Sequence, residues 1–98
     1  MITNFNEFIT EGLNNMMVYK NKDKSKNIYK DTISYTIFKG NEMYHVECRG
    51  IEIVNWKYQG KVNLNLYSVN GTLVSGKNNI GLFINLQKTL EPVKKEIK

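Results

Sequence analysis

The chain of 98 residues contains no alanine, the residue with the strongest intrinsic preference for helices. Valine, isoleucine, threonine, tyrosine, phenylalanine and tryptophan, which favour strands, together supply 34 residues. This bias constrains the chain to a fold in which β-strands dominate. A chain of this length can bury one hydrophobic core, so we expect residues 1–98 to form a single domain.

The most regular alternation of apolar and polar side chains predicts a hairpin over residues 33–49. Ile33, Tyr35 and Ile37 alternate with polar residues, as in a strand with one buried face. Gly40–Asn41 follows and predicts a tight turn, because both residues tolerate a positive φ. In the next strand the side chains predicted to face the core are Tyr44, Val46 and Cys48, and those predicted to face solvent are Met43, His45, Glu47 and Arg49.

Two further alternating segments predict strands at residues 62–66 and 80–86. Between them, Asn70–Gly71 predicts a type I′ hairpin turn. The register around residues 55–58 stays open, because the alternation is lost there. We expect the two strands to bury one set of apolar side chains against Phe5, Phe8 and Leu13, and this set is Val62, Leu64, Leu66, Ile80, Leu82 and Ile84.

The segment before these strands has a helical pattern. Phe5, Phe8, Ile9, Leu13 and Met16 recur at helical spacing, which predicts an amphipathic helix over about residues 4–15. The predicted fold class is therefore α+β, with this N-terminal helix packed on a five- or six-stranded antiparallel meander. The alternative is a small closed β-barrel with the helix plugging one end. The predicted segments are the helix at 4–15, a short strand at 16–20, a basic loop at 20–27, the meander at about 28–87 and a charged tail at 92–98.

The positive charge is almost entirely lysine. The formal net charge is +5, and Arg49 is the one arginine among 14 basic residues. A protein that reads DNA sequence uses arginine forks on guanine edges, so this composition argues against that class. Asparagine, lysine, isoleucine and tyrosine, whose codons are AT-rich, make up 43 residues, which points to a low-GC bacterium or one of its phages.

Single copies of cysteine and histidine exclude several kinds of site. Cys48 has no cysteine partner for an internal disulfide, and with His45 it offers no metal-ligand pair at the usual spacing. No phosphate-binding glycine loop is present. We expect no metal, no cofactor and no membrane span, and the absence of a signal peptide pattern predicts a cytoplasmic protein, in the bacterial host cell if a phage encodes it.

One group of residues has a catalytic character. His45, Glu47 and Arg49 lie two residues apart on a predicted strand and therefore share a face. A base, an acid and a phosphate-holding arginine suit a small metal-independent ribonuclease. The simpler interpretation, which we favour, is the solvated face of a strand whose charges pair across the sheet.

A second group suits binding. Trp56, Lys57, Tyr58 and Lys61 place aromatic rings among lysines, as single-strand nucleic-acid binders do. The 20–27 loop could add phosphate contacts. The same surface also has the composition of a protein-binding hot spot. The loop lysines concerned are Lys22, Lys24 and Lys26.

The leading hypothesis is a small non-catalytic binding protein. We expect it to be an accessory protein of a phage or mobile element that binds and inhibits a host factor, such as a component of a defence system. Its expected partner is a protein. A nucleic-acid-binding module and the ribonuclease are the alternatives, and an open sheet could also pair edge to edge into a homodimer.

Overall fold

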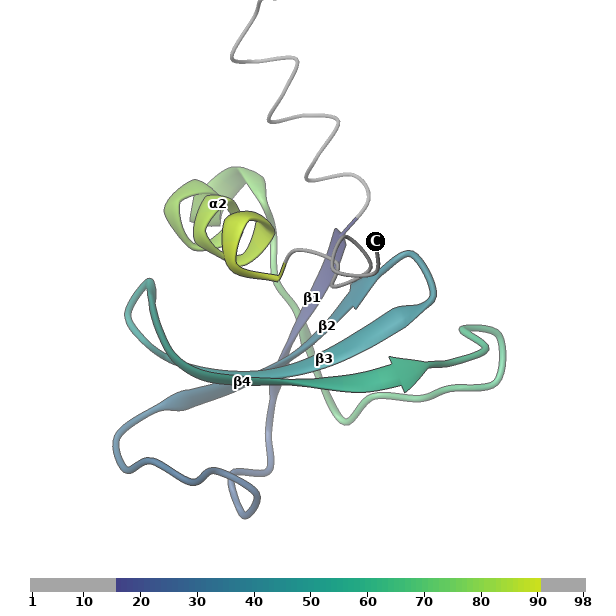
Figure 1. Ribbon diagram of the computed structural model, residues 1–98, viewed down its shortest axis with the longest axis horizontal. Coiled ribbons are helices and arrows are strands. Elements are labelled where there is room, and N and C mark those ends of the chain that lie inside the picture. Colours follow the sequence, from purple (N-terminus) through teal and green to yellow (C-terminus); the bar gives the residue numbers. More distant parts are fainter. Residues whose placement is uncertain (1–15, 91–98) are drawn as a thin grey trace, which may run out of the picture.

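The computed structural model describes residues 16–90, and its centre is a five-stranded antiparallel sheet in the order β4-β3-β2-β1-β5 (Figure 1). A 3-10 turn at Lys77–Asn79 leads into the one α-helix of the described residues, α2. The strands are β1 (Met16–Asn21), β2 (Ile33–Lys39), β3 (Glu42–Arg49), β4 (Glu52–Lys61) and β5 (Gly71–Leu73), and α2 is Ile80–Thr89.

Glycine makes the two tight turns of the sheet. The β2–β3 hairpin predicted at Gly40–Asn41 is confirmed, with Lys39 opposite Glu42. The φ of Gly40 is +65°, whereas the φ of Asn41 is negative. A positive φ at the first of the two turn residues alone is typical of a type II′ turn. Gly50, with φ +63°, has the same position between β3 and β4. These turns fix the register that places alternate β3 side chains on opposite faces.

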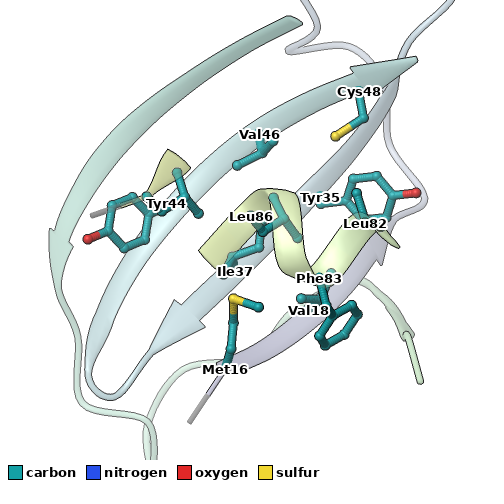
Figure 2. Close-up of a cluster of buried hydrophobic side chains, with 11 residues drawn as sticks. Met16, Val18, Tyr35, Ile37, Tyr44, Val46, Cys48, Leu82, Phe83 and Leu86 are labelled. Atoms are coloured by element: carbon teal, nitrogen blue, oxygen red, sulfur yellow. The ribbon is translucent and has the colours of Figure 1, made fainter. Parts of the chain in front are cut away.

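Helix α2 covers one face of the sheet and forms the core with it (Figure 2). Tyr44, Val46 and Cys48 are buried here, as the alternation predicts. Two hydrogen bonds attach the helix to the sheet and its turns. Lys39 Nζ donates to the Leu90 carbonyl just after α2 (2.7 Å), and Asn85 Nδ2, in the middle of α2, donates to the Ile51 carbonyl in the β3–β4 turn (2.8 Å). The other core residues are Met16, Val18, Tyr35, Ile37, Leu82, Phe83, Leu86 and Leu90.

The predicted fold class is wrong about which helix packs on the sheet. The apolar face is covered by C-terminal α2, so an N-terminal helix is not the covering element. The expected helix at 4–15 and the expected tail at 92–98 lie outside the described residues. The closed barrel is also wrong, because β4 and β5 are the two edges of an open sheet. The strand expected at 16–20 is confirmed as β1.

The segment expected to be the last strand, 80–86, is helical. Its alternating apolar residues fit a strand, but Leu82, Phe83, Leu86 and Leu90 also form a helical stripe, and this stripe is the buried one. Of the core set predicted from the last two segments, Leu82 is buried, whereas Ile80 is exposed and Ile84 is half-buried. A short apolar run fits both periods, and the available sheet face decided between them.

The strand expected at 62–66 is a turn, and the hairpin expected at Asn70–Gly71 is wrong. Leu64 and Leu66 are exposed, so this segment contributes little to the core. Gly71 instead begins β5, which pairs with β1. A Cβ at Gly71 would lie 2.5 Å from the Lys20 carbonyl oxygen, so this glycine permits close approach of two strands rather than a turn.

Within residues 16–90, no helix is long and apolar enough to cross a membrane.

We expect the helix to carry stability that the 62–66 segment does not. Leu86→Ala removes a fully buried side chain and should lower the free energy of unfolding by about 2–5 kcal/mol. Leu66→Ala is the matched control, because Leu66 is 82% exposed and its loss should cost less than about 0.5 kcal/mol. Urea unfolding of both variants measures the difference, and equal losses would contradict the packing of α2 on the sheet.

Candidate functional site

A polar cleft lies on the face of the sheet opposite α2. Its volume is about 390 Å³, and its floor is formed by polar side chains of β2, β3 and β4. One wall is the β1–β2 loop (residues 22–32), which lies below the sheet in Figure 1, and the other is segment 62–70. The lining residues are Asn21, Asp23, Lys26, Ile28, Ser34, Thr36, Met43, Tyr44, His45, Glu47, Asn55, Lys57, Gln59, Tyr67, Ser68, Val69 and Asn70.

The two walls are attached to the sheet and to each other. Tyr67 packs edge-on against the buried Phe38, with ring centroids 5.7 Å apart. The backbone N–H of Lys22 donates to the Asn70 carbonyl (3.2 Å) and so joins the walls. Asn21 holds the floor, because its side chain bonds both the Ser34 hydroxyl (2.8 Å) and the Thr36 hydroxyl (2.9 Å). These contacts hold the walls and the floor of the cleft in fixed positions.

Glu47 is fully buried, in contrast to the solvated position expected from the sequence. Its Oε1 accepts the backbone N–H groups of Ile28 (3.0 Å) and Tyr29 (2.9 Å), and its Oε2 accepts Ile28 N–H (3.0 Å) and the Asn55 amide (3.4 Å). Burial opposes ionisation, but these hydrogen bonds outweigh it and hold the pKa of Glu47 below its ordinary value. The carboxylate therefore fastens the β1–β2 loop to β3.

His45 is next to Glu47 on the cleft floor. Its Nε2 lies 3.9 Å from Glu47 Oε2, is itself buried, and has no hydrogen-bond partner among residues 16–90. Burial lowers the pKa of His45 below its ordinary value, more than the charge of Glu47 raises it, and the positive charges of Lys26 and Lys57 lower it further. His45 therefore favours its neutral form more strongly than a solvated histidine does.

Arg49 is separated from the other two residues of the expected catalytic trio. Its guanidinium is exposed and donates to the Lys30 carbonyl (3.0 Å), and it does not line the cleft. The structure thus brings His45 and Glu47 together and leaves Arg49 outside. Glu47 is also poorly suited to acid–base work, because both of its oxygens already hold the loop.

The expected binding cluster is divided between the two faces of β4. Trp56 and Tyr58 lie on the helix side, where their rings pack on buried Tyr44 with centroids 6.0 Å and 5.3 Å away. Lys57 faces the opposite side and lines the cleft. Lys61 is at the end of β4, opposite Glu42. Of the three loop lysines, Lys26 lines the cleft, and Lys22 and Lys24 do not.

Neighbouring strand residues alternate between faces, and two irregularities in β4 decide which face each of these residues takes. The register of β4 against β3 shifts at Val54 and again at Gln59, each time by one extra residue. The first shift puts Ile53 and Trp56 on the same face, although they are three residues apart. This explains why the alternation is lost around residues 55–58 of the sequence.

Several cleft residues have no distinguishing pattern in the sequence. Asn21, Asn55 and Asn70 come from three separate segments, and asparagine is so common in this chain that no single one stands out. Tyr67 comes directly after the segment, 62–66, whose alternation predicts a strand. The ring contact with Phe38 brings Tyr67 to the cleft, and the hydrogen bond from Lys22 brings Asn70.

Other chemistries have little support in the described part of the chain. Residues 16–90 contain no group of three side chains suited to hold a metal ion. Cys48 is buried in the core, and burial raises its pKa to about 11, so its thiol is not a nucleophile at neutral pH.

Comparisons with protein-family models, with curated proteins and with solved structures give no match.

We expect Glu47→Gln to destabilise the protein by about 2 kcal/mol or more, because hydrogen bonds to a buried charged acceptor contribute about 1.5–3 kcal/mol. The NH₂ group of the glutamine would also face backbone N–H groups of Ile28 and Tyr29, and two donors cannot form a hydrogen bond. Amide hydrogen exchange should accelerate at Ile28 and Tyr29. Glu52→Gln is the control, because Glu52 is exposed, and a loss of the same size in both variants would contradict the fastening role of Glu47.

We also expect stability to fall with acidification in two stages. The pKa of His45 is lower in the folded state, so its stabilising contribution is present above its ordinary value of 6.5 and decreases as pH falls below it. Glu47 acts in the same direction below its ordinary value of 4.5. Urea unfolding between about pH 8 and 5.5 isolates the first stage, since His45 is the one histidine. A His45→Gln variant should show a flatter dependence, and an unchanged slope would contradict the burial of His45.

Proposed function

We propose that this protein is a non-catalytic binding protein whose partner is another protein, recognised along the outer edge of β4, which pairs with β3 alone among the strands of residues 16–90. The observation that carries the proposal is the pair of aromatic side chains on that edge. Trp56 and Tyr58 remain 38% and 42% exposed although both pack on Tyr44. Exposed tryptophan and tyrosine held in place by a buried neighbour lose little entropy on binding, which is a property of interface hot spots.

The backbone of β4 supports the same proposal. The strand is an edge of the sheet, so the side away from β3 has hydrogen-bonding groups that an extended peptide can pair with. Between the two register shifts, Asn55 to Tyr58 keep regular pairing with β3. This regular stretch is long enough for a short added strand, and the bulges on either side limit indiscriminate edge pairing.

The ribonuclease has weaker support. Its acid would be Glu47, whose oxygens are occupied by the β1–β2 loop, and its arginine lies outside the cleft. A general base or acid needs a free oxygen within reach of the substrate. His45 would then act without an acid–base partner.

The biological setting belongs to the same proposal. The AT-rich residue usage supports an accessory protein of a phage or mobile element in the cytoplasm of a bacterial host. Binding through the edge of β4 suits the inhibition of a host factor, such as a component of a defence system. A protein that adds a strand to its target can block that target without catalysis.

The test compares two edges of the same sheet. Immobilised wild type and two variants are incubated with nuclease-treated lysate of a low-GC bacterium, and the proteins retained are quantified by mass spectrometry. Trp56→Ser with Tyr58→Ser should lower retention of a specific protein about 30-fold or more, as loss of a hot spot of about 2 kcal/mol does. Leu73→Ser, at the opposite edge on β5, is the control and should retain it.

Three results would overturn the proposal. One is equal retention by wild type and the Trp56, Tyr58 variant, and another is equal loss in the Leu73 variant. The third is a wild type that forms a dimer by light scattering while the Trp56, Tyr58 variant stays monomeric. In that case the occupant of the β4 edge is a second copy of this chain.

A further inference from the structure

The cleft opposite α2 has the form of a ligand site and is separate from the aromatic side of β4. Its volume of about 390 Å³ falls within the range of about 300–1,000 Å³ that is typical of small-molecule sites. Its floor is a sheet, and both walls are held by hydrogen bonds or ring packing. Such a cavity keeps its shape without a ligand, which lowers the entropic cost of binding.

The acidic groups of the cleft already have donors. Glu47 accepts two backbone N–H groups and the Asn55 amide. Asp23 accepts the backbone N–H of Ser25 (2.9 Å) and its hydroxyl (3.1 Å), and this N–H is the main reason that the pKa of Asp23 is lowered. Both carboxylates are therefore committed to holding the β1–β2 loop, and neither has a lysine as its ion-pair partner within residues 16–90.

The basic groups of the cleft differ in this respect. Lys26 reaches it from the β1–β2 loop and Lys57 from β4, so the two approach from different elements. Among residues 16–90, neither has a hydrogen bond or an ion pair. Both are close enough to His45 for their charges to act on its imidazole. Lys57 is the partner of His45 in the β3–β4 pairing, and Lys26, whose charge also acts on Asp23 of its own loop, lines the same cleft.

We propose that this cleft binds the phosphate group of a ligand, held by Lys26 and Lys57 over His45. Ammonium groups donate to phosphate oxygens with charge-assisted hydrogen bonds, which are stronger than neutral ones. His45 adds a positive charge on the cleft floor when the phosphate is bound, because a nearby anion favours the protonated imidazole. The rest of a larger ligand would lie along Tyr67 and Asn70, which line the other wall.

The formal charges of the lining make the proposal specific. Lys26 and Lys57 balance Asp23 and Glu47, so the cleft has no large net charge to attract anions from a distance. Binding must then come from direct contacts with the two ammonium groups. It should depend on these particular lysines and not on the overall charge of +5.

The experiment titrates three probes into the ¹⁵N-labelled protein and follows amide and His45 ring resonances. The probes are inorganic phosphate, adenosine monophosphate and a ten-residue oligothymidylate, which separate a free phosphate, a nucleotide and a nucleic-acid strand as its source. Lys26→Gln with Lys57→Gln is the test variant. Lys22→Gln with Lys24→Gln is the matched control, because it removes the same charge from exposed residues that do not line the cleft.

We expect at least one probe to shift the resonances of His45 and Asn70 saturably. The Lys26, Lys57 variant should bind that probe about tenfold or more weakly, and the Lys22, Lys24 variant within about twofold of wild type. Equal weakening in both variants would show attraction by overall charge and overturn the proposal. Saturable shifts elsewhere, or no saturable shift with any probe at low salt, would overturn it as well.

Discussion

The buried carboxylate of Glu47 joins β3 to the backbone of Ile28 and Tyr29, and the cleft depends on this attachment. An ionised group without solvent is costly unless donors surround it, and here the loop supplies them. The buried carboxylate is in β3, and the N–H groups that compensate its loss of solvent are 18 and 19 residues away in the chain. The β1–β2 loop is consequently a wall of fixed position, although Ile28 and Tyr29 expose their side chains.

The two faces of the sheet are covered in different ways. On one face, helix α2 buries apolar side chains against β1, β2 and β3 (Figure 2). On the other, hydrogen bonds and one ring contact hold the β1–β2 loop and segment 62–70 over polar side chains. Strand β3 serves both, with Tyr44, Val46 and Cys48 toward the helix and His45 and Glu47 toward the cleft.

The bulged strand β4 separates the two proposed activities of the protein. Its register shifts turn Trp56 and Tyr58 to the helix side and Lys57 to the cleft side. A protein partner at the edge of β4 and a phosphate in the cleft would therefore use neighbouring residues on opposite faces. The aromatic and lysine residues that form one cluster in the sequence are two separate surfaces in the fold.

The sequence by itself determined β2, β3, their hairpin turn and the two faces of β3, because a period of two residues and a glycine turn are local properties. It also placed Cys48 in the core. The tertiary structure alone decided that residues 80–89 are a helix, since their apolar pattern fits both periods and the open sheet face selects one. It alone decided that His45 and Glu47 lie in a cleft, because the loop that covers them arrives from a distant part of the chain, and no local pattern encodes that contact.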